Sequence, residues 1–249
     1  MNLNSILGVV SSIVLFAPII LILAFKLFNN RSFLALCLYY FLSGIYNLIS
    51  QDIFNAPALF SRSLGILVNL LDAPLMLLFL IFFSTSVLMK KRITAAIFIF
   101  LVFEAIVLLI YGFSVQTVKI ILGPDIMVII VLSFLFFMRN VRLAVTNLKS
   151  LGKAIIASSV LLSYTIFTVV YIFYYLFKNK QYQDDAELVY YLVTILSVVL
   201  MSAGIIIENK RIRKLGELKN TRKELATIYG KTRTAGANND GRFLKTGEY

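Results

Sequence analysis

The stretch that decides the fold is LGILVNLLDAPLMLLFLIFFSTSVLM, residues 64–89, which is almost wholly apolar. A helix needs about 20 apolar residues, each adding 1.5 Å, to cross a hydrocarbon core about 30 Å thick. Asn69, Asp72 and Pro74 nevertheless lie inside the stretch, and an Asp at the centre of such a helix costs about 2.5–3.5 kcal/mol. Pro74 lacks a backbone N–H, so the carbonyl of Leu70 loses its helical partner. We therefore expect a transmembrane helix with a candidate polar site around Asp72.

The composition of the whole chain is typical of an integral membrane protein. Of its 249 residues, 60% are hydrophobic and only 14% are charged, whereas a soluble domain is about 45–50% apolar and about 25% charged. The chain has no His and no Trp, and its single cysteine is Cys37. We therefore expect no disulfide within the chain, no metal site and no cofactor. Abundant Ile, Lys, Asn and Tyr indicate an A/T-rich bacterial genome, so the expected location is the bacterial cytoplasmic membrane.

Seven apolar spans, each close to the length of a tilted transmembrane helix, follow one another along the chain. They cover residues 5–25, 33–50, 64–89, 93–113, 118–138, 154–177 and 187–208. The first span lacks the basic start and the cleavage site of a signal peptide, so we expect a retained helix. Short connections make consecutive helices antiparallel neighbours. The sequence predicts an all-α fold, a polytopic seven-transmembrane-helix bundle over residues 1–208.

The distribution of charge predicts the orientation of this bundle. Twenty of the twenty-four Lys and Arg residues follow the first, third, fifth and seventh spans. The opposite side has four basic residues against five acids, which are Asp52, Asp125, Asp184, Asp185 and Glu187. Basic residues stay on the cytoplasmic side, so we expect the N-terminus outside and the C-terminus in the cytoplasm. The net charge of +12 then favours anionic lipid, and no nucleic acid, as a partner.

The segment that follows the seventh span is basic and periodic. Over residues 209–229, apolar side chains recur near one helical face and predict a basic amphipathic juxtamembrane helix. Candidates for contact with anionic lipid or with a protein partner are Lys210, Arg211, Arg213 and Lys214. Residues 230–249 have no periodicity, which predicts a disordered tail.

Asp72 and Glu104 are expected to lie at similar depths in neighbouring helices. Asp72 follows Leu64 by eight residues in a span that enters from outside, and Glu104 follows Ile93 by eleven in a span that enters from inside. At 1.5 Å per residue, we expect the two acids to lie within roughly 5–10 Å of each other in depth. Two close carboxylates do not both ionise readily in a low dielectric, so the pair would share a proton or hold a cation. The alternative is that each acid is neutral and hydrogen-bonded to backbone or to Tyr.

Side chains with hydroxyl groups are concentrated in the sixth and seventh spans. Tyr164, Thr168 and Tyr171 recur at helical spacing and predict a ligand pocket in the outer half of the bundle. The alternative is an aromatic belt at the outer interface, with Ser and Thr hydrogen-bonding between helices. The candidate ligand or proton site comprises Asn69, Asp72, Pro74, Glu104, Tyr46, Tyr164, Thr168 and Tyr171.

The usual catalytic signatures are missing from the sequence. It has no histidine base, no G-x-S-x-G turn, no phosphate-binding glycine loop and no dinucleotide-binding fingerprint. Aspartyl chemistry inside a membrane needs two converging Asp residues, and we expect only Asp72 to be buried. We therefore predict a protein that is not an enzyme.

Three short segments resemble parts of the microbial-rhodopsin family, which also has seven helices with the N-terminus outside. Residues 45–48, IYNL, resemble the Tyr-bearing end of that family's second helix. Residues 72–75, DAPL, are similar to the proline-bearing middle of the third helix, and residues 163–165, SYT, to the Tyr-Pro region of the sixth. The resemblance implies a shared helical architecture.

Retinal chemistry is excluded by the residues at which this chain departs from the family. Met201 stands near the place of the retinal-binding lysine, Val68 replaces the counter-ion acid, and the tryptophans that clamp retinal do not exist here. The first functional hypothesis is therefore a non-enzymatic sensor or receptor-like protein that binds a small apolar or amphipathic ligand and cannot form a retinal Schiff base. The alternatives are a proton- or cation-coupled transporter or channel that uses Asp72 and Glu104, and a membrane subunit that docks a protein partner. An oligomer is compatible with each of them.

Overall fold

The backbone in the computed structural model is described over residues 3–84, 86–147, 150–173 and 180–240. These residues contain helices and no strands. The helices are α1 (Leu3–Val14), α2 (Ala17–Ala24), a 3₁₀ turn η1 (Leu27–Asn29), α3 (Arg31–Ser50), α4 (Ala58–Phe83), α5 (Val87–Tyr111), α6 (Val115–Asn147), α7 (Leu151–Tyr171) and α8 (Lys180–Asp240). Seven helical segments among the described residues are long and apolar enough to cross a membrane, as the sequence predicts. The first of them, Asn4–Ala24, combines α1 and α2.

The first predicted span, residues 5–25, is interrupted rather than continuous. Leu15 and Phe16 separate α1 from α2, and Pro18 lies in the first turn of α2. Proline is tolerated there because the first-turn N–H groups have no helical acceptor. The apolar side chains continue through the break, so hydropathy alone does not reveal it.

The third predicted span, residues 64–89, is wrong at both ends. Helix α4 begins earlier, at Ala58, and ends at Phe83, while Val87 already belongs to α5. The backbone turns extended at Ser84, whose hydroxyl accepts the backbone N–H of Ser86 at 3.3 Å. Short hydroxyl side chains compete with helical hydrogen bonds in this way. The three basic residues at 90–92 therefore lie inside α5 and do not form the connection.

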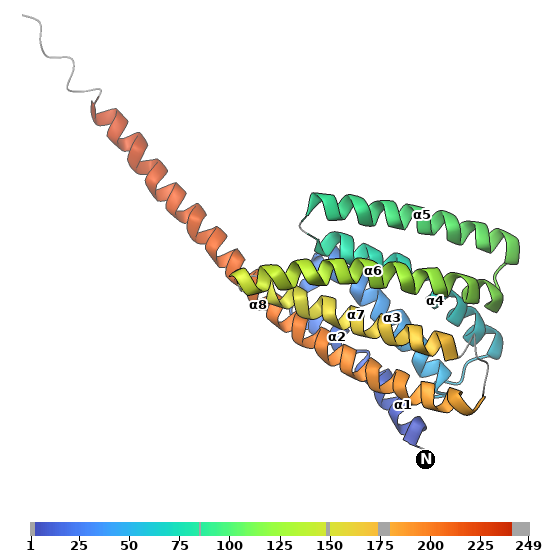
Figure 1. Cartoon of the computed structure of the whole chain (residues 1–249). Coiled ribbons are helices and arrows are strands. Elements are labelled where there is room, and N and C mark those ends of the chain that lie inside the picture. Colours follow the sequence, from blue (N-terminus) through green and yellow to red (C-terminus); the bar gives the residue numbers. More distant parts are fainter. Residues whose placement is uncertain (1–2, 85, 148–149, 174–179, 241–249) are drawn as a thin grey trace, which may run out of the picture. The chain divides into compact units, whose positions relative to one another are not determined.

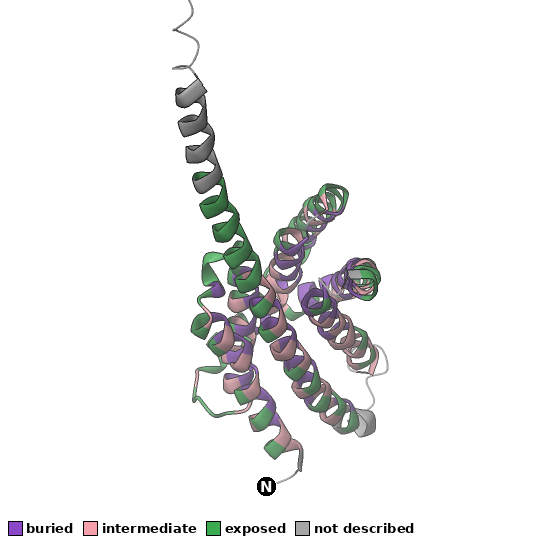
Figure 2. Ribbon diagram, turned by 90° about the vertical axis from the view of Figure 1, so that its left-hand side faces the viewer, coloured by how far each residue is buried: buried purple, intermediate pink, exposed green. Residues whose placement is uncertain are grey.

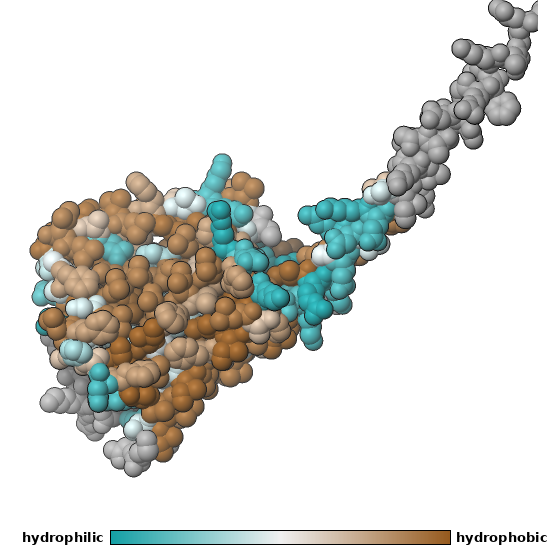
Figure 3. Space-filling view, turned by 180° about the vertical axis from the view of Figure 1, so that it is seen from behind, coloured by the Kyte–Doolittle hydropathy of each residue, from teal (hydrophilic) through white to brown (hydrophobic). Residues whose placement is uncertain are grey.

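The bundle is built from neighbouring helices in sequence, as short connections require. Helix α3 packs on α4, α4 on α5 and α6, and α6 on α7. Figure 1 shows α5 along one side of the bundle, next to α6. Figure 2 shows the buried faces of the bundle helices turned inward and the exposed faces outward. Much of the exposed surface is apolar, as the brown face in Figure 3 shows.

Helices α7 and α8 approach each other closely at two glycines. A Cβ on Gly152 would lie 2.7 Å from the backbone nitrogen of Glu208, and a Cβ on Gly204 would lie 3.0 Å from the backbone nitrogen of Ile156. Further along the same contact, the Ser159 hydroxyl donates to the carbonyl of Ser197 at 2.6 Å. Small residues that allow backbones to approach are typical of helix pairs in membranes.

A buried lysine joins α7 to the end of α4. The Lys153 ammonium donates to the carbonyl of Phe83, the last residue of α4, at 2.7 Å and lies 4.6 Å from the centre of the Phe83 ring. A cation at a helix C-terminus is favourable because the last carbonyls carry partial negative charge. Lys153 therefore stabilises the bundle at the end opposite to the α3–α4 connection.

The chain divides into two units, residues 1–208 and 209–249. In the second unit the helix continues to Asp240, beyond the predicted end at 229 and into the region where a disordered tail is predicted. Residues 241–249 lie outside the described residues. Leu215, Leu218 and Leu225, on the predicted apolar face, are exposed.

Candidate functional site

Asp72 is the centre of a hydrogen-bonded group that connects three helices. It is half-buried on α4, and its Oδ1 accepts a hydrogen bond of 2.8 Å from the hydroxyl of Tyr164 on α7. The hydroxyl of Tyr39 on α3 also bonds to this carboxyl group and interacts with Tyr164. The Tyr164 side chain is only 1% exposed, so its hydroxyl has no access to bulk water. Two tyrosines, one on α3 and one on α7, thus contact the carboxyl group of Asp72.

A second aspartate lies next to this group, and the prediction for it is wrong. Asp125, counted from sequence as an outer acid, is within α6 and only 1% exposed. It interacts with Asp72 and, electrostatically, with Glu104 of α5, which is 6% exposed. Asp72 and Glu104, which the sequence predicts to be neighbours, therefore share a third acid as an interaction partner.

The carboxyl group of Asp125 lacks donors from the described residues. Neither of its oxygens has a donor at hydrogen-bonding distance and angle, and both are shielded from solvent. Buried polar atoms in proteins are nearly always hydrogen-bonded, and an exception costs about 1–3 kcal/mol. A functional role is one reason for such an exception.

Each aspartate lies beside a proline in its helix. Pro74 follows Asp72 by two residues in α4, and Pro124 directly precedes Asp125 in α6. Both helices continue through their prolines. Because proline removes one backbone hydrogen bond, each helix has a carbonyl without its helical donor one turn before the proline. The acids therefore lie where the two helices have fewest internal bonds.

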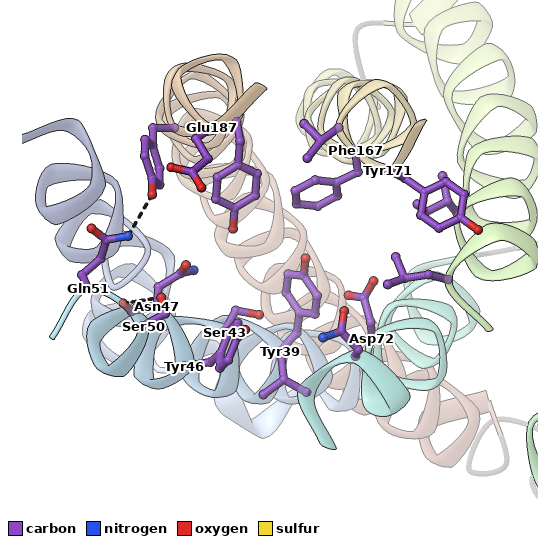
Figure 4. A pocket seen from close by; sticks show the side chains of 17 residues that line it. Tyr39, Ser43, Tyr46, Asn47, Ser50, Gln51, Asp72, Phe167, Tyr171 and Glu187 are labelled. Atoms are coloured by element: carbon purple, nitrogen blue, oxygen red, sulfur yellow. Dashed lines mark hydrogen bonds between the residues drawn. The ribbon is translucent and has the colours of Figure 1, made fainter. Parts of the chain in front are cut away.

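A cavity of about 360 Å³ adjoins Asp72 and is walled by five helices. It extends along the bundle from Asp72 to the end where α3 stops and α8 starts, near Gln51 and Glu187 (Figure 4). The lining residues are Tyr39, Ser43, Tyr46, Asn47, Ser50, Gln51, Val68, Asn69, Asp72, Leu122, Ile126, Phe167, Val170, Tyr171, Glu187, Tyr190 and Tyr191. Its wall is therefore mostly aromatic and polar.

Several polar side chains of the wall are held by local contacts. Gln51 donates to the Tyr191 hydroxyl at 2.9 Å, which joins the end of α3 to α8 (Figure 4). Asn69 donates from its amide nitrogen to the carbonyl of Gly65 at 2.7 Å, so its oxygen stays available as an acceptor. The ring of Tyr46 packs where a Cβ of Gly65 would be, at 2.8 Å. These contacts hold the side chains of the cavity wall in place.

The candidate residues divide between the cavity wall and positions behind it. Tyr46, Asn69, Asp72 and Tyr171 line the cavity. Tyr164 lies behind Asp72. Thr168 donates to the carbonyl of Tyr164 at 3.0 Å, a bond within α7 rather than the bond between helices that the alternative predicts.

Sequence reasoning did not include Tyr39, Gln51, Tyr190 and Asp125 among the site residues. The single usable signal was the Pro-Asp pair inside the fifth apolar span, at residues 124–125, which repeats the proximity of acid and proline at residues 72–74.

The four basic candidates lie in the second unit. Lys210, Arg213 and Lys214 are exposed, and Arg211 is half-buried.

Comparison of the chain with protein-family models, with curated proteins and with solved structures gives no match.

Proposed function

We propose that the chain is a non-enzymatic, receptor-like integral membrane protein that binds a small ligand in the cavity between α3, α4, α6, α7 and α8. The observation that carries the proposal is the cavity itself, about 360 Å³ in size, with polar groups distributed among aromatic walls. Ligand sites are typically concave and of about 300–1,000 Å³, and they combine apolar walls with a few placed polar groups.

The proposed orientation has the N-terminus outside and the C-terminus in the cytoplasm. It is supported by the bias of Lys and Arg toward the connections and the segment that we assign to the cytoplasm. In this orientation the end of the cavity near Gln51 and Glu187 faces the outer side, because that end of the bundle is the one with few basic residues. The proposed location is the bacterial cytoplasmic membrane, and the basic helix after residue 208 would lie in the cytoplasm next to anionic lipid.

Native mass spectrometry of the gently solubilised full chain tests the proposal. A ligand carried through purification gives a reproducible non-lipid adduct. Leu122→Phe places a larger side chain in the cavity wall and is expected to abolish the adduct. Leu67→Phe is the matched control, since Leu67 is 41% exposed on the outer surface of α4. An adduct that survives Leu122→Phe as well as it survives Leu67→Phe contradicts binding in this cavity.

A proton- or cation-coupled carrier is the second candidate, and the position of Asp125 favours it. The carboxyl groups of Asp72, which is half-buried, and of Asp125, which is buried and lacks a hydrogen-bond donor among the described residues, interact, and they form a site at which a proton or a small cation lowers the electrostatic cost. The two prolines give both helices a place to bend. Because Asp125 is buried next to Asp72, the expectation that only one Asp is buried no longer argues against aspartyl chemistry. Asp125 does not, however, line the cavity.

Flux into proteoliposomes, followed with a pH-sensitive dye, tests the carrier. Asp125→Asn is expected to abolish proton movement while the protein remains folded. Glu187→Gln, an acid at the other end of the cavity, is the control that should retain it. Equal flux in the wild type and in Asp125→Asn contradicts a proton path through this pair.

A further inference from the structure

We infer that the ligand of the cavity is a small organic cation, such as an alkylammonium or arylalkylammonium ion, held between the aromatic wall and the carboxyl group of Asp72. The inference rests on the proposed function, because it specifies the chemical class of ligand for the same cavity. It is carried by the charges and by the ring systems of the lining residues.

The charged residues among the described residues of the wall all have one sign. Asp72 and Glu187 lie toward different ends of the cavity (Figure 4). Among the described residues that line the cavity there is no Lys and no Arg, although the chain as a whole has a net charge of +12. A cleft with acids of one sign and low-dielectric walls concentrates cations and repels anions. The local charge is thus opposite to the overall charge of the chain.

The aromatic residues supply the second element of cation recognition. Six of the lining residues are aromatic: Tyr39, Tyr46, Phe167, Tyr171, Tyr190 and Tyr191. Phe167 of α7 stacks on Tyr190 of α8, with ring centres 5.5 Å apart and planes inclined by 29°. Tyr191 meets Tyr190 edge-on, also at 5.5 Å. Ring faces attract alkylammonium ions by about 0.5–2 kcal/mol each, most strongly where water is excluded.

The same wall does not suit a bare metal ion. Among the residues whose side chains are described, no group of three or more His, Cys, Asp or Glu is placed to hold a metal. A divalent ion requires several oxygen ligands at 2.0–2.6 Å, whereas this cavity is about 360 Å³ and has its two acids at different ends. An organic cation fills such a volume and needs one carboxylate.

The Asp72 carboxyl group is held in place for this contact. Its Oδ1 accepts from Tyr164, which lies behind the cavity wall. A carboxylate has about four acceptor sites, so bonds from two tyrosines leave acceptor capacity for a ligand. A ligand ammonium would donate to that remaining capacity while its apolar groups contact Tyr39 and Phe167.

Charge-selective labelling of a cysteine in the cavity tests the inference. Cys37, the single native cysteine, is replaced by Ala, and Ser43→Cys then places one thiol in the cavity wall. The full chain in nanodiscs is treated with a cationic reagent, trimethylammonioethyl methanethiosulfonate, and with the anionic sulfonatoethyl analogue. Asn55→Cys, in the exposed connection between α3 and α4, gives the reference ratio of the two rates. Comparing ratios cancels the different thiol reactivities of the two sites.

We expect the cation-to-anion rate ratio at Ser43→Cys to exceed the reference ratio by roughly tenfold, the lower end of electrostatic steering. Asp72→Asn together with Glu187→Gln should return the ratio to the reference. Benzyltrimethylammonium should slow the labelling of Ser43→Cys, and benzenesulfonate should not.

The possible failures of the two proposals are distinct. Labelling by both reagents at the reference ratio, with protection by benzenesulfonate equal to that by benzyltrimethylammonium, overturns the cation inference and leaves a ligand cavity in place. A Ser43→Cys thiol that neither reagent reaches, in a protein whose Asn55→Cys thiol reacts, shows a closed cavity. That result overturns the proposed function together with the inference.

Discussion

Replacing Tyr164 with Phe tests the central contact of the site by removing a single oxygen. The ring of Tyr164 is buried, 1% exposed, and meets Phe167 edge-on with ring centres 5.6 Å apart. Phe preserves these ring contacts. The change therefore removes the 2.8 Å hydrogen bond to Asp72 and the polar contact of the same hydroxyl with Tyr39.

The expected loss of stability follows from the partners of the bond. Interhelical hydrogen bonds in membrane proteins contribute about 0.6 kcal/mol on average and up to about 1.7 kcal/mol. Bonds to a carboxylate belong to the stronger class, about 1.5–3 kcal/mol in proteins generally. Asp72 retains Tyr39 as a donor, so the carboxyl group is not left without a partner. We expect Tyr164→Phe to lower the free energy of unfolding by about 1–1.5 kcal/mol.

The measurement is reversible unfolding in bicelles by sodium dodecyl sulfate, followed by circular dichroism. A double-mutant cycle with Asp72→Ala isolates the pair, and the expected coupling is about 1 kcal/mol. Tyr171→Phe is the control, because the Tyr171 hydroxyl donates to the carbonyl of Lys119 rather than to an acid. A coupling near zero between Tyr164 and Asp72 would refute the reasoning that this bond organises the site.

Three further changes test other contacts of the bundle. Asp125→Leu removes a buried carboxyl group without a donor and should raise the free energy of unfolding by about 1–3 kcal/mol in the same titration; a loss of stability would mean that the group has a partner. Gly152→Ala forces a methyl group toward the backbone of Glu208 and should lower the Tm, with an expected cost of about 1–3 kcal/mol; Gly216→Ala, which meets nothing within 4 Å, is the control. Lys153→Met keeps the apolar stem but loses the bond to Phe83, and should cost about 1.5–3 kcal/mol as judged by thermal unfolding of the purified protein; an unchanged Tm would exclude this bond as a stabilising contact.

The number of membrane-length helices could be predicted from the sequence because hydropathy over about twenty residues is a strong signal. The ends of the helices could not. At residues 84–86 the chain leaves one helix and starts another within an apolar run, and the hydroxyl side chains there are too few to lower the average hydropathy. Pro18 and the break before it are masked by the same averaging.

Asp72 could be identified from the sequence because an acid in an apolar span is rare and costly. Its partners could not be identified in the same way. Tyr39 and Tyr164 are separated by more than a hundred residues, and their meeting depends on which face each helix turns inward. Several helices of this chain are apolar on all sides, and such helices lack the polar face that would orient them.

Asp125 was misplaced for a related reason. It lies seven residues after the start of a predicted span and six after Lys119, so charge counting places it near the outer surface. The helix instead begins at Val115, three residues earlier than predicted, and this displaces Asp125 toward the interior. Three residues along a helix are about 4.5 Å, nearly one turn, so Asp125 lies deeper in its helix than the predicted span indicates.

Asp125 is the residue that separates the two candidate functions. A receptor needs Asp72 and the aromatic wall, and Asp125 does not line that wall. A buried carboxyl group without a donor lowers the free energy of unfolding by about 1–3 kcal/mol. In a receptor this loss of stability has no functional return, because Asp125 would not contact the ligand. A carrier does gain, because the second carboxyl group gives the proton or cation a place to move from Asp72. Asp125→Leu should therefore leave the charge-selective labelling of Ser43→Cys unchanged in a receptor and should abolish flux in a carrier. Two results together would support the receptor alone. Asp125→Leu would be more stable than the wild type and keep the charge-selective labelling of Ser43→Cys, and the wild type itself would show no proton flux.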